Sequence, residues 1–162
     1  MNAYYDLDQT LMTWESQQGH HRQTTEQGFL CKHCHNYVSA HMLFSGVQNR
    51  NHCPYCLWSR HMDLYEAGDR LAACKAKMQP VGLALKQSHK KYGMGSLGEL
   101  MLIHACTECG KLSVNRIAAD DDAATVMEVY EASLAAGWRL EDIHPLTAAE
   151  RPLVRSRLYG MA

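Results

Sequence analysis

Two apolar runs in the second half of the chain predict a β-hairpin. They occupy residues 81–86 and 100–103, and a polar, glycine-rich segment from 87 to 98 separates them. Short apolar runs joined in this way are typical of paired antiparallel strands. We therefore expect two strands here, with the glycine-rich segment as the loop between them.

Apolar residues at helical spacing predict helices near both ends of the chain. Near the N-terminus, four apolar residues fit one helical face: Leu7, Leu11, Met12 and Trp14. A second stripe follows the acidic run 120–122, whose charges suit the positive end of a helix dipole, and consists of Val126, Val129, Tyr130 and Leu134. The stretch from Thr147 to Glu150 matches a capping box and predicts the start of a last helix.

Between these helices the chain is rich in cysteine. Six of its 7 cysteines form three Cys-x-x-Cys pairs. The sequence shows no secretory signal and no apolar stretch of membrane-spanning length, so we expect a reducing, cytoplasmic location. Paired thiols in that setting more often hold zinc than form disulfides. The cysteine-rich middle has few long apolar runs, and we expect metal to stabilise it.

The first two pairs predict one four-thiolate zinc site. Cys31 and Cys34 are followed, after a spacer of zinc-ribbon length, by Cys53 and Cys56. An apolar pair leads into the first knuckle and Tyr37-Val38 follows it, as in the strand, tight turn and returning strand of a zinc ribbon. The segment around residues 45–47 is expected to be an irregular loop.

A second zinc site is predicted with one ligand left open. Cys74, Cys106 and Cys109 supply three thiolates, and either His61 or His104 supplies the fourth ligand. His104 lies two residues before Cys106, so on a strand both side chains point the same way. His61 lies five residues after Cys56 and can reach across from the first site. We favour His61, and the other histidine then supports a ligand or packs in the core.

These elements predict a small, metal-stapled α+β protein that carries two Zn²⁺ ions. Its expected centre is a pair of zinc-ribbon-like β units packed together over residues 28–119. Residues 1–27 are expected to form a polar N-terminal extension, and residues 120–162 a helical C-terminal extension.

The tract Arg50-Asn51-His52-Cys53-Pro54 resembles the signature of the RNHCP-domain family of bacterial zinc-ribbon-like proteins. Further positions match across roughly residues 28–122: Cys56, Leu57, Ser59, His61, Asp63, Gly68-Asp69-Arg70, Cys74, Met78-Gln79-Pro80, His104, Cys106, Cys109-Gly110, Asn115-Arg116 and Ala119-Asp120-Asp121. Ala76 departs from the small glycine expected there. The resemblance implies metal binding and an intracellular role, and it brings no assigned activity.

Charge is unevenly distributed along the chain, which bears on the partner. Residues 28–119 hold eleven Lys and Arg against five Asp and Glu, whereas residues 1–27 hold one against four. Basic loops on a rigid zinc scaffold can reach phosphates, so we expect RNA or a ribonucleoprotein such as the ribosome as partner. The candidate contacts are Arg50, Arg60, Lys86, Lys90, Lys91 and Tyr92, with Tyr55 and Trp58 as stacking surfaces. The alternative is that the arginines pair with nearby acids and that both aromatic residues cover the metal.

Two other functions compete with RNA binding. In the first, zinc is purely structural and the C-terminal helices offer an apolar docking face for a protein, which the low net charge of −1 favours. In the second, Asn51-His52 and His61-x-Asp63 belong to a metal-dependent nuclease. Catalytic zinc needs an open coordination position. Because the thiolates close both predicted sites, we expect no enzyme activity.

Overall fold

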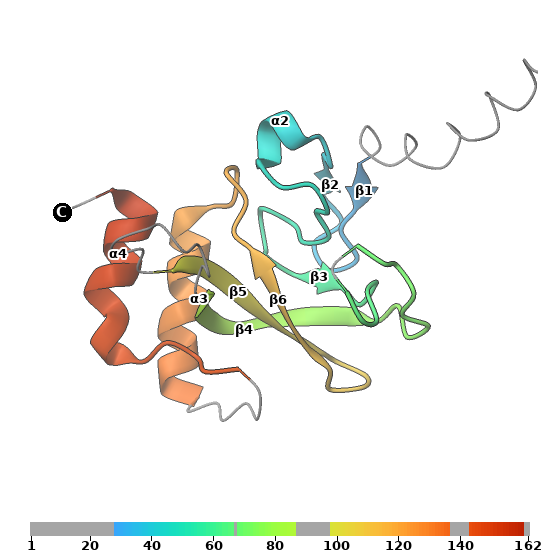
Figure 1. The fold of residues 1–162 in the computed structure, drawn as a ribbon. Coiled ribbons are helices and arrows are strands. Elements are labelled where there is room, and N and C mark those ends of the chain that lie inside the picture. The colour runs from blue at the N-terminus through green and yellow to red at the C-terminus, as the bar shows by residue number, and fades with distance from the viewer. Residues whose placement is uncertain (1–27, 67, 87–97, 137–142, 161–162) are drawn as a thin grey trace, which may run out of the picture.

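The structure, a computed structural model, describes residues 28–66, 68–86, 98–136 and 143–160. It has a two-stranded and a four-stranded sheet with helices packed against the larger one (Figure 1). This is a small α+β fold, as expected. The expected N-terminal helix and the loop with Lys90, Lys91 and Tyr92 lie outside the described residues. Within the described segments, no helix is long and apolar enough to cross a bilayer.

The smaller sheet surrounds the first cysteine pair. Strands β1 (Phe29–Leu30) and β2 (Tyr37–Val38) run antiparallel, with Phe29 opposite Val38. A single-turn helix, α2 (Met42–Ser45), follows, where an irregular loop was expected. The His41 ring accepts a hydrogen bond from Leu43 N–H at its start, and Gly46 ends it in the left-handed conformation.

The larger sheet is antiparallel throughout, in the order β3-β4-β5-β6. It consists of β3 (Ser59–Arg60), β4 (Lys77–Lys86), β5 (Glu99–Cys106) and β6 (Leu112–Arg116). The β4–β5 pair confirms the predicted hairpin and extends it towards the metal ligands. Its register shifts between Pro80 and Gly82, where proline cannot donate a ladder hydrogen bond.

Helix α3 (Ala123–Ala136) packs against β4, and α4 (Arg151–Tyr159) lies on the outer side of α3 (Figure 1). Gly82 permits this close approach, because a Cβ there would lie 3.3 Å from the Ser133 Cβ of α3. The resulting core joins the sheet, the helices and the residue after the second cysteine pair: Leu57, Leu83, Leu100, Leu102, Val126, Tyr130, Leu146 and Val154. The C-terminal helices are therefore part of the main hydrophobic core.

Burial of α3 overturns one expectation from the sequence. Val126 and Tyr130 are 0% exposed, so the apolar stripe faces the sheet and offers no docking face. The predicted capping box is confirmed: Thr147 and Glu150 cap the 3₁₀ turn η1 (Ala148–Glu150), and α4 follows directly with Pro152 in its first turn. Leu146 N–H donates to the Leu83 carbonyl at 2.8 Å and fixes this segment to β4.

Candidate metal centres

All three Cys-x-x-Cys turns have the same backbone geometry. In each, the residue after the second cysteine donates its N–H to the carbonyl of the first, and its backbone is left-handed: His35 (φ 63°), Leu57 (φ 60°) and Gly110 (φ 72°). The N–H of the first cysteine donates to a carbonyl five residues on, at 2.9 Å in every case. Gly110 adopts this conformation freely, as expected, whereas His35 and Leu57 each oppose it by about 1–2 kcal/mol.

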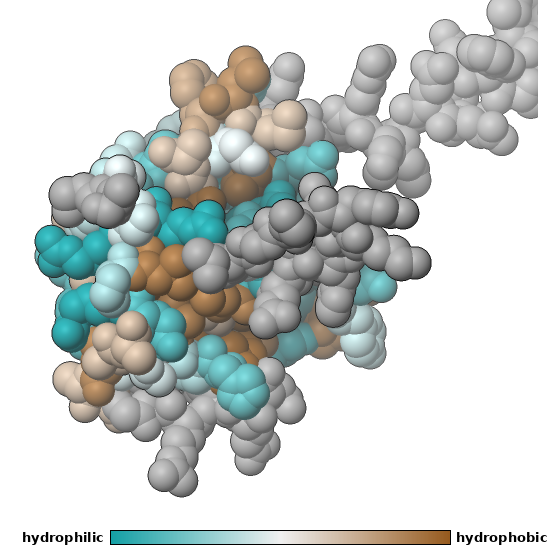
Figure 2. All heavy atoms as spheres, turned by 60° about the vertical axis from the view of Figure 1, so that its left-hand side comes forward, coloured by the Kyte–Doolittle hydropathy of each residue, from teal (hydrophilic) through white to brown (hydrophobic). Residues whose placement is uncertain are grey.

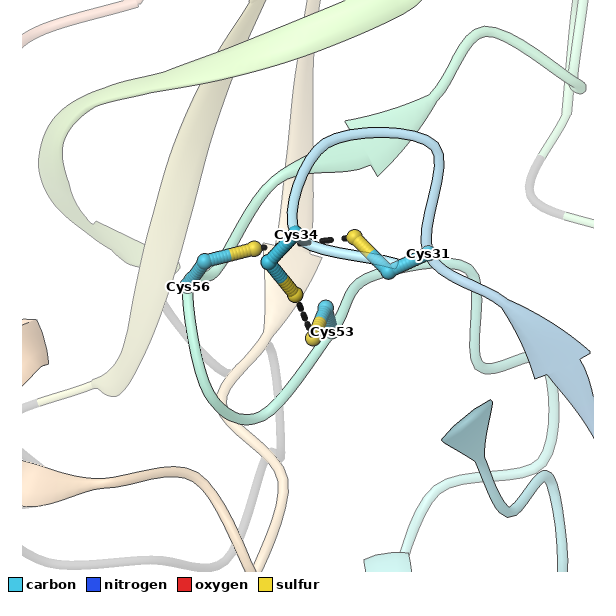
Figure 3. A group of neighbouring side chains, drawn as sticks. All are labelled: Cys31, Cys34, Cys53 and Cys56. Atoms are coloured by element: carbon cyan, nitrogen blue, oxygen red, sulfur yellow. Dashed lines mark hydrogen bonds between the residues drawn. The ribbon is translucent and has the colours of Figure 1, made fainter. Parts of the chain in front are cut away.

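The first cluster brings together Cys31, Cys34, Cys53 and Cys56, as predicted. Figure 3 shows the four thiols converging on one point from two facing turns. The Sγ atoms of Cys31 and Cys56 are 3.6 Å apart, as are those of Cys34 and Cys53. Because Cys31 and Cys53 are buried, the protein interior covers one side of this cluster.

The second cluster consists of His61, Cys74, Cys106 and Cys109. His61 follows β3, Cys106 ends β5, and Cys74 lies in the connection to β4. The Sγ atoms of Cys74 and Cys106 are 3.7 Å apart, and His61 Nδ1 is 3.4 Å from Cys109 Sγ. Cys74 and Cys109 are exposed, so this cluster lies at the surface.

Both donor sets fit zinc. Ligands held at about 2.3 Å around a tetrahedral ion are about 3.8 Å apart, close to the separations above. In each cluster all four ligand atoms lie within 4.8 Å of one another, and all seven cysteines are free thiols. Each cluster can therefore hold one Zn²⁺, which gives two per chain.

The structure brings His61, and not His104, to the second cluster. His104 is fully buried, and its Nε2 donates to the Leu57 carbonyl at 2.7 Å. Its Nδ1 accepts from the Asn115 amide at 2.8 Å, so neither ring nitrogen is free for metal. Burial lowers the pKa of His104 to about 3 and keeps the ring neutral. The sequence had placed Asn115 in the family pattern without showing this role.

Thiol acidity differs within each cluster. Burial raises the pKa of Cys53 to about 11. For Cys34 and Cys106 burial also acts upward, but hydrogen bonds from nearby backbone N–H groups and thiols outweigh it and lower the pKa to about 7 and about 6, respectively. Cys34 in the first cluster and Cys106 in the second therefore ionise near neutral pH, while Cys53 stays protonated there until a cation binds.

Arg50 lies in a buried ion-pair network, and its predicted role as an RNA contact is wrong. It is 4% exposed, and its guanidinium contacts Asp120 at 2.7 Å and Asp121 at 3.2 Å. Its Nε donates to the His52 carbonyl at 3.1 Å. A guanidinium fixed on all sides in this way cannot reach an external phosphate.

His52 also belongs to this network. Its Nε2 lies 2.8 Å from a carboxylate oxygen of Asp121, which accepts a second hydrogen bond from Ala118 N–H at 2.7 Å. Asp122 N–H donates to the Pro54 carbonyl at 3.3 Å. The tract from Arg50 to Pro54 therefore fastens the first cluster to the start of α3.

Of the remaining candidate contacts, Arg60 and Lys86 lie where a partner can reach them. Lys86 is exposed at the end of β4, and Arg60 is half-buried on β3 with its Nε donating to the Lys75 carbonyl. Asp69 accepts hydrogen bonds from four backbone N–H groups of its own turn, chiefly those of Leu71 and Glu66, which lower its pKa well below the usual range. The Asp69 carboxylate therefore stabilises its own turn.

The fold and both clusters define a zinc-binding α+β protein stapled at two points. The family model for the RNHCP domain matches residues 26–127, more than half of the chain. The chain therefore belongs to the RNHCP domain family. No curated protein matches the chain, and no solved structure does.

Proposed function

We propose that this protein is a non-catalytic zinc module, built from two zinc-ribbon-like units, that binds single-stranded RNA alone or within a ribonucleoprotein such as the ribosome. The observation that carries the proposal is a cationic surface around β3, here called the β3 surface, which lies between the two clusters. It consists of Lys32, Arg60 and Arg70, which line one cavity, of Lys77, which pairs with Arg60 across the strands, and of Lys75, whose ammonium donates to the Arg70 carbonyl at 2.9 Å. The proposal places the protein in the cytoplasm, where reduced thiols hold zinc.

The strongest feature of the β3 surface is the pair formed by Arg60 and Lys77. The two residues are direct partners in the β3–β4 register. Like charges in that position destabilise a sheet unless an anion lies between them. Over the described residues, neither side chain forms an ion pair with a carboxylate, whereas Arg70 forms a long one with Asp63 at 3.8 Å. Arg60 and Lys77 are therefore available to phosphate.

Part of the positive charge of the β3 surface offsets the negative charge of the metal-bound clusters. A zinc ion with three or four thiolates carries excess negative charge, and the nearby Lys32 and Arg60 reduce its electrostatic cost. The remaining cations predict moderate affinity with a measurable salt dependence. Trp58 does not supply an open stacking face, because the His33 ring stacks on it at 4.0 Å and Lys77 lies 5.7 Å from its centroid. Tyr55, 60% exposed, remains available for stacking.

A non-catalytic role is favoured by the ligand sets. Each cluster offers four ligand atoms, which completes a tetrahedral zinc and leaves no position for water or substrate. The His52–Asp121 pair resembles a catalytic dyad in composition, but its side chains are 2% and 0% exposed. A buried pair already bonded to Arg50 has no access to an RNA backbone.

Fluorescence anisotropy with labelled single-stranded RNA and the zinc-loaded protein tests the proposal. The slope of log K against log salt should fall by about 0.7 for each phosphate contact removed. We expect Arg60→Gln with Lys77→Gln to weaken binding and flatten this slope. Arg155→Gln, an exposed residue of α4, is the matched control and should change neither. Salt-independent binding, or no binding by the wild type, would refute the RNA assignment.

A protein partner is the second candidate, supported by an apolar patch on α2. Met42, Leu43 and Phe44 are 50%, 84% and 65% exposed, and Figure 2 shows apolar side chains gathered over this helix at the top of the view. This patch replaces the C-terminal stripe as the candidate docking face. A partner retained at high salt and lost with Leu43→Ser would favour this function.

A further inference from the structure

A cavity of about 380 Å³ opens beside the β3 surface. It lies between the first metal knuckle and β3, and its walls include Lys32, Asn51, Trp58, Ser59, Arg60 and Arg70. Its volume falls at the lower end of the range of about 300–1,000 Å³ that is usual for ligand pockets. The cavity therefore suits a ligand no larger than a single nucleotide.

Two residues that line the cavity each have a buried polar atom without a partner among the described residues. Asn51 Oδ1 and Ser59 Oγ are buried, and neither makes a hydrogen bond to any residue that the structure describes. Ser59 is 5% exposed, and a β-bridge places it opposite His52, the residue after Asn51. Leaving a buried polar group unpaired costs about 1–3 kcal/mol, so a ligand that supplies the missing partners gains affinity.

The residues on either side of Asn51 have partners within the fold, whereas the Asn51 side-chain oxygen has none in the part of the chain that the structure describes. Arg50 and His52 bond to the carboxylates before α3, and Cys53 belongs to the first cluster. Asn51 differs from these neighbours, because its side-chain oxygen is buried and accepts no hydrogen bond from the described residues. Its amide and the Ser59 hydroxyl are groups that recognise the hydrogen-bonding edge of a base.

The charge and polarity of the other walls match the rest of a nucleotide. Lys32, Arg60 and Arg70 line the cavity, and no Asp or Glu does so among the described residues. Phe29, Leu30 and Met62 add apolar surface for the face of a base. Apolar surface, an amide oxygen and a hydroxyl without partners among the described residues, and nearby guanidinium groups together suit a planar base with an attached phosphate.

We propose that this cavity takes one unpaired nucleotide of the bound RNA. Asn51 and Ser59 contact the edge of the base, while Arg60 and Arg70 contact its phosphate. This inference rests on the proposed function, because it takes the nucleotide from an RNA chain. A free mononucleotide has the same chemistry, and the experiment distinguishes the two sources.

The test measures base preference separately from charge. Zinc-loaded full-length protein is titrated with labelled ten-nucleotide homopolymers of A, C and U. We expect the wild type to prefer one base by about tenfold, since a good side-chain pair discriminates by about 1–3 kcal/mol. Asn51→Leu, which keeps the branching of the side chain at Cγ but removes its hydrogen bonds, should abolish the preference and leave the salt slope unchanged. Arg60→Gln should flatten the slope.

Ser59→Ala serves as a second variant should Asn51→Leu fail to fold, and Gln79→Ala on the exposed side of β4 is the control. Zinc content and circular dichroism verify folding in every variant. RNA binding with an unchanged base preference in Asn51→Leu and Ser59→Ala would overturn the cavity assignment while leaving the proposed function intact.

If the wild type binds no RNA, the proposed function is wrong. Titration with free mononucleotides then tests whether the cavity binds a nucleotide at all. NMR shifts of the Asn51 side-chain amide with 1 mM AMP, CMP, GMP or UMP, absent with inorganic phosphate, would keep the nucleotide site and make its source a free mononucleotide. No shift with any mononucleotide, or equal shifts with phosphate alone, would overturn the site.

Discussion

Removing the Asp121 carboxylate should destabilise the protein far more than removing its neighbour Asp120. The Asp121 side chain is 0% exposed, whereas that of Asp120 is 34% exposed, and both contact the same guanidinium of Arg50. The two residues are adjacent in sequence, and they differ in burial and in the number of groups that they bond to. They therefore form a matched pair for measuring what the buried network contributes.

The expected size follows from the groups left behind. Asp121→Ala leaves three buried donors short of an acceptor: Arg50 Nη2, His52 Nε2 and Ala118 N–H. Breaking a buried ion pair by removing one partner costs about 3–5 kcal/mol. Asp120→Ala removes the acceptor of Arg50 Nη1, but the Asp120 side chain is 34% exposed, so water can take the place of its carboxylate and the cost should be about 1 kcal/mol. Because His52 precedes Cys53, the zinc affinity of the first cluster should fall with Asp121→Ala as well.

Urea denaturation at a fixed free-zinc concentration measures both variants against the wild type. Zinc affinity is obtained separately by competition with a chromophoric chelator. The double variant Arg50→Met with Asp121→Leu should recover much of the loss, since apolar replacement of a whole buried pair is close to neutral. Equal losses for Asp120→Ala and Asp121→Ala, or a loss below about 1 kcal/mol for Asp121→Ala, would refute the reasoning.

Three further measurements probe other parts of the molecule. Native mass spectrometry should find one zinc fewer in His61→Ala and an unchanged count in His104→Ala, and the reverse pattern would contradict the assigned ligand. Backbone N–H groups, chiefly that of Leu71, lower the pKa of Asp69 in the folded protein. The ionised carboxylate therefore contributes its full stabilisation at any pH above the unfolded pKa of about 3.9, and this contribution is lost only as pH falls through the lowered, folded pKa. The stability deficit of Asp69→Asn, measured by denaturation, should therefore be constant from pH 8 to 5, and a deficit that changes in this range would contradict it. Tyr130→Ala should lose about 3–5 kcal/mol in urea denaturation, because its ring is fully buried between sheet and helices, and a loss below about 1 kcal/mol would show that α3 adds little to the core.

Local patterns in the sequence were sufficient to predict the six ligands that lie in Cys-x-x-Cys pairs. Such a turn determines its own geometry within six residues, so these ligands follow from spacing. The choice of His61 required more, since only the β3–β4 pairing brings the end of β3 to Cys106 and Cys109. The hairpin was also predictable from its apolar runs, although its extension through Pro80 was not, because proline argues against a strand except at an irregularity such as the one found here.

Long-range pairings limited what the sequence predicts about function. From the sequence alone, Arg50 is predicted to be a surface cation. In the structure Asp120 and Asp121, about seventy residues later in the chain, bind its guanidinium. The stripe on α3 reads as a docking face because an amphipathic pattern does not say which surface it meets. The pairing of Arg60 with Lys77, and with it the β3 surface, depends on a cross-strand register that no local pattern encodes.

Leu57 makes the first cluster a reporter of events in the distant core. Its N–H closes the turn of Cys53, its carbonyl accepts from His104, and its side chain packs in the core shared with α3. Thermodynamic linkage is reciprocal, so whatever loosens that core also weakens the hold on zinc, by up to a factor of ten for every 1.4 kcal/mol transmitted. Metal occupancy in the cell would then register the folding state of the chain as well as the supply of zinc.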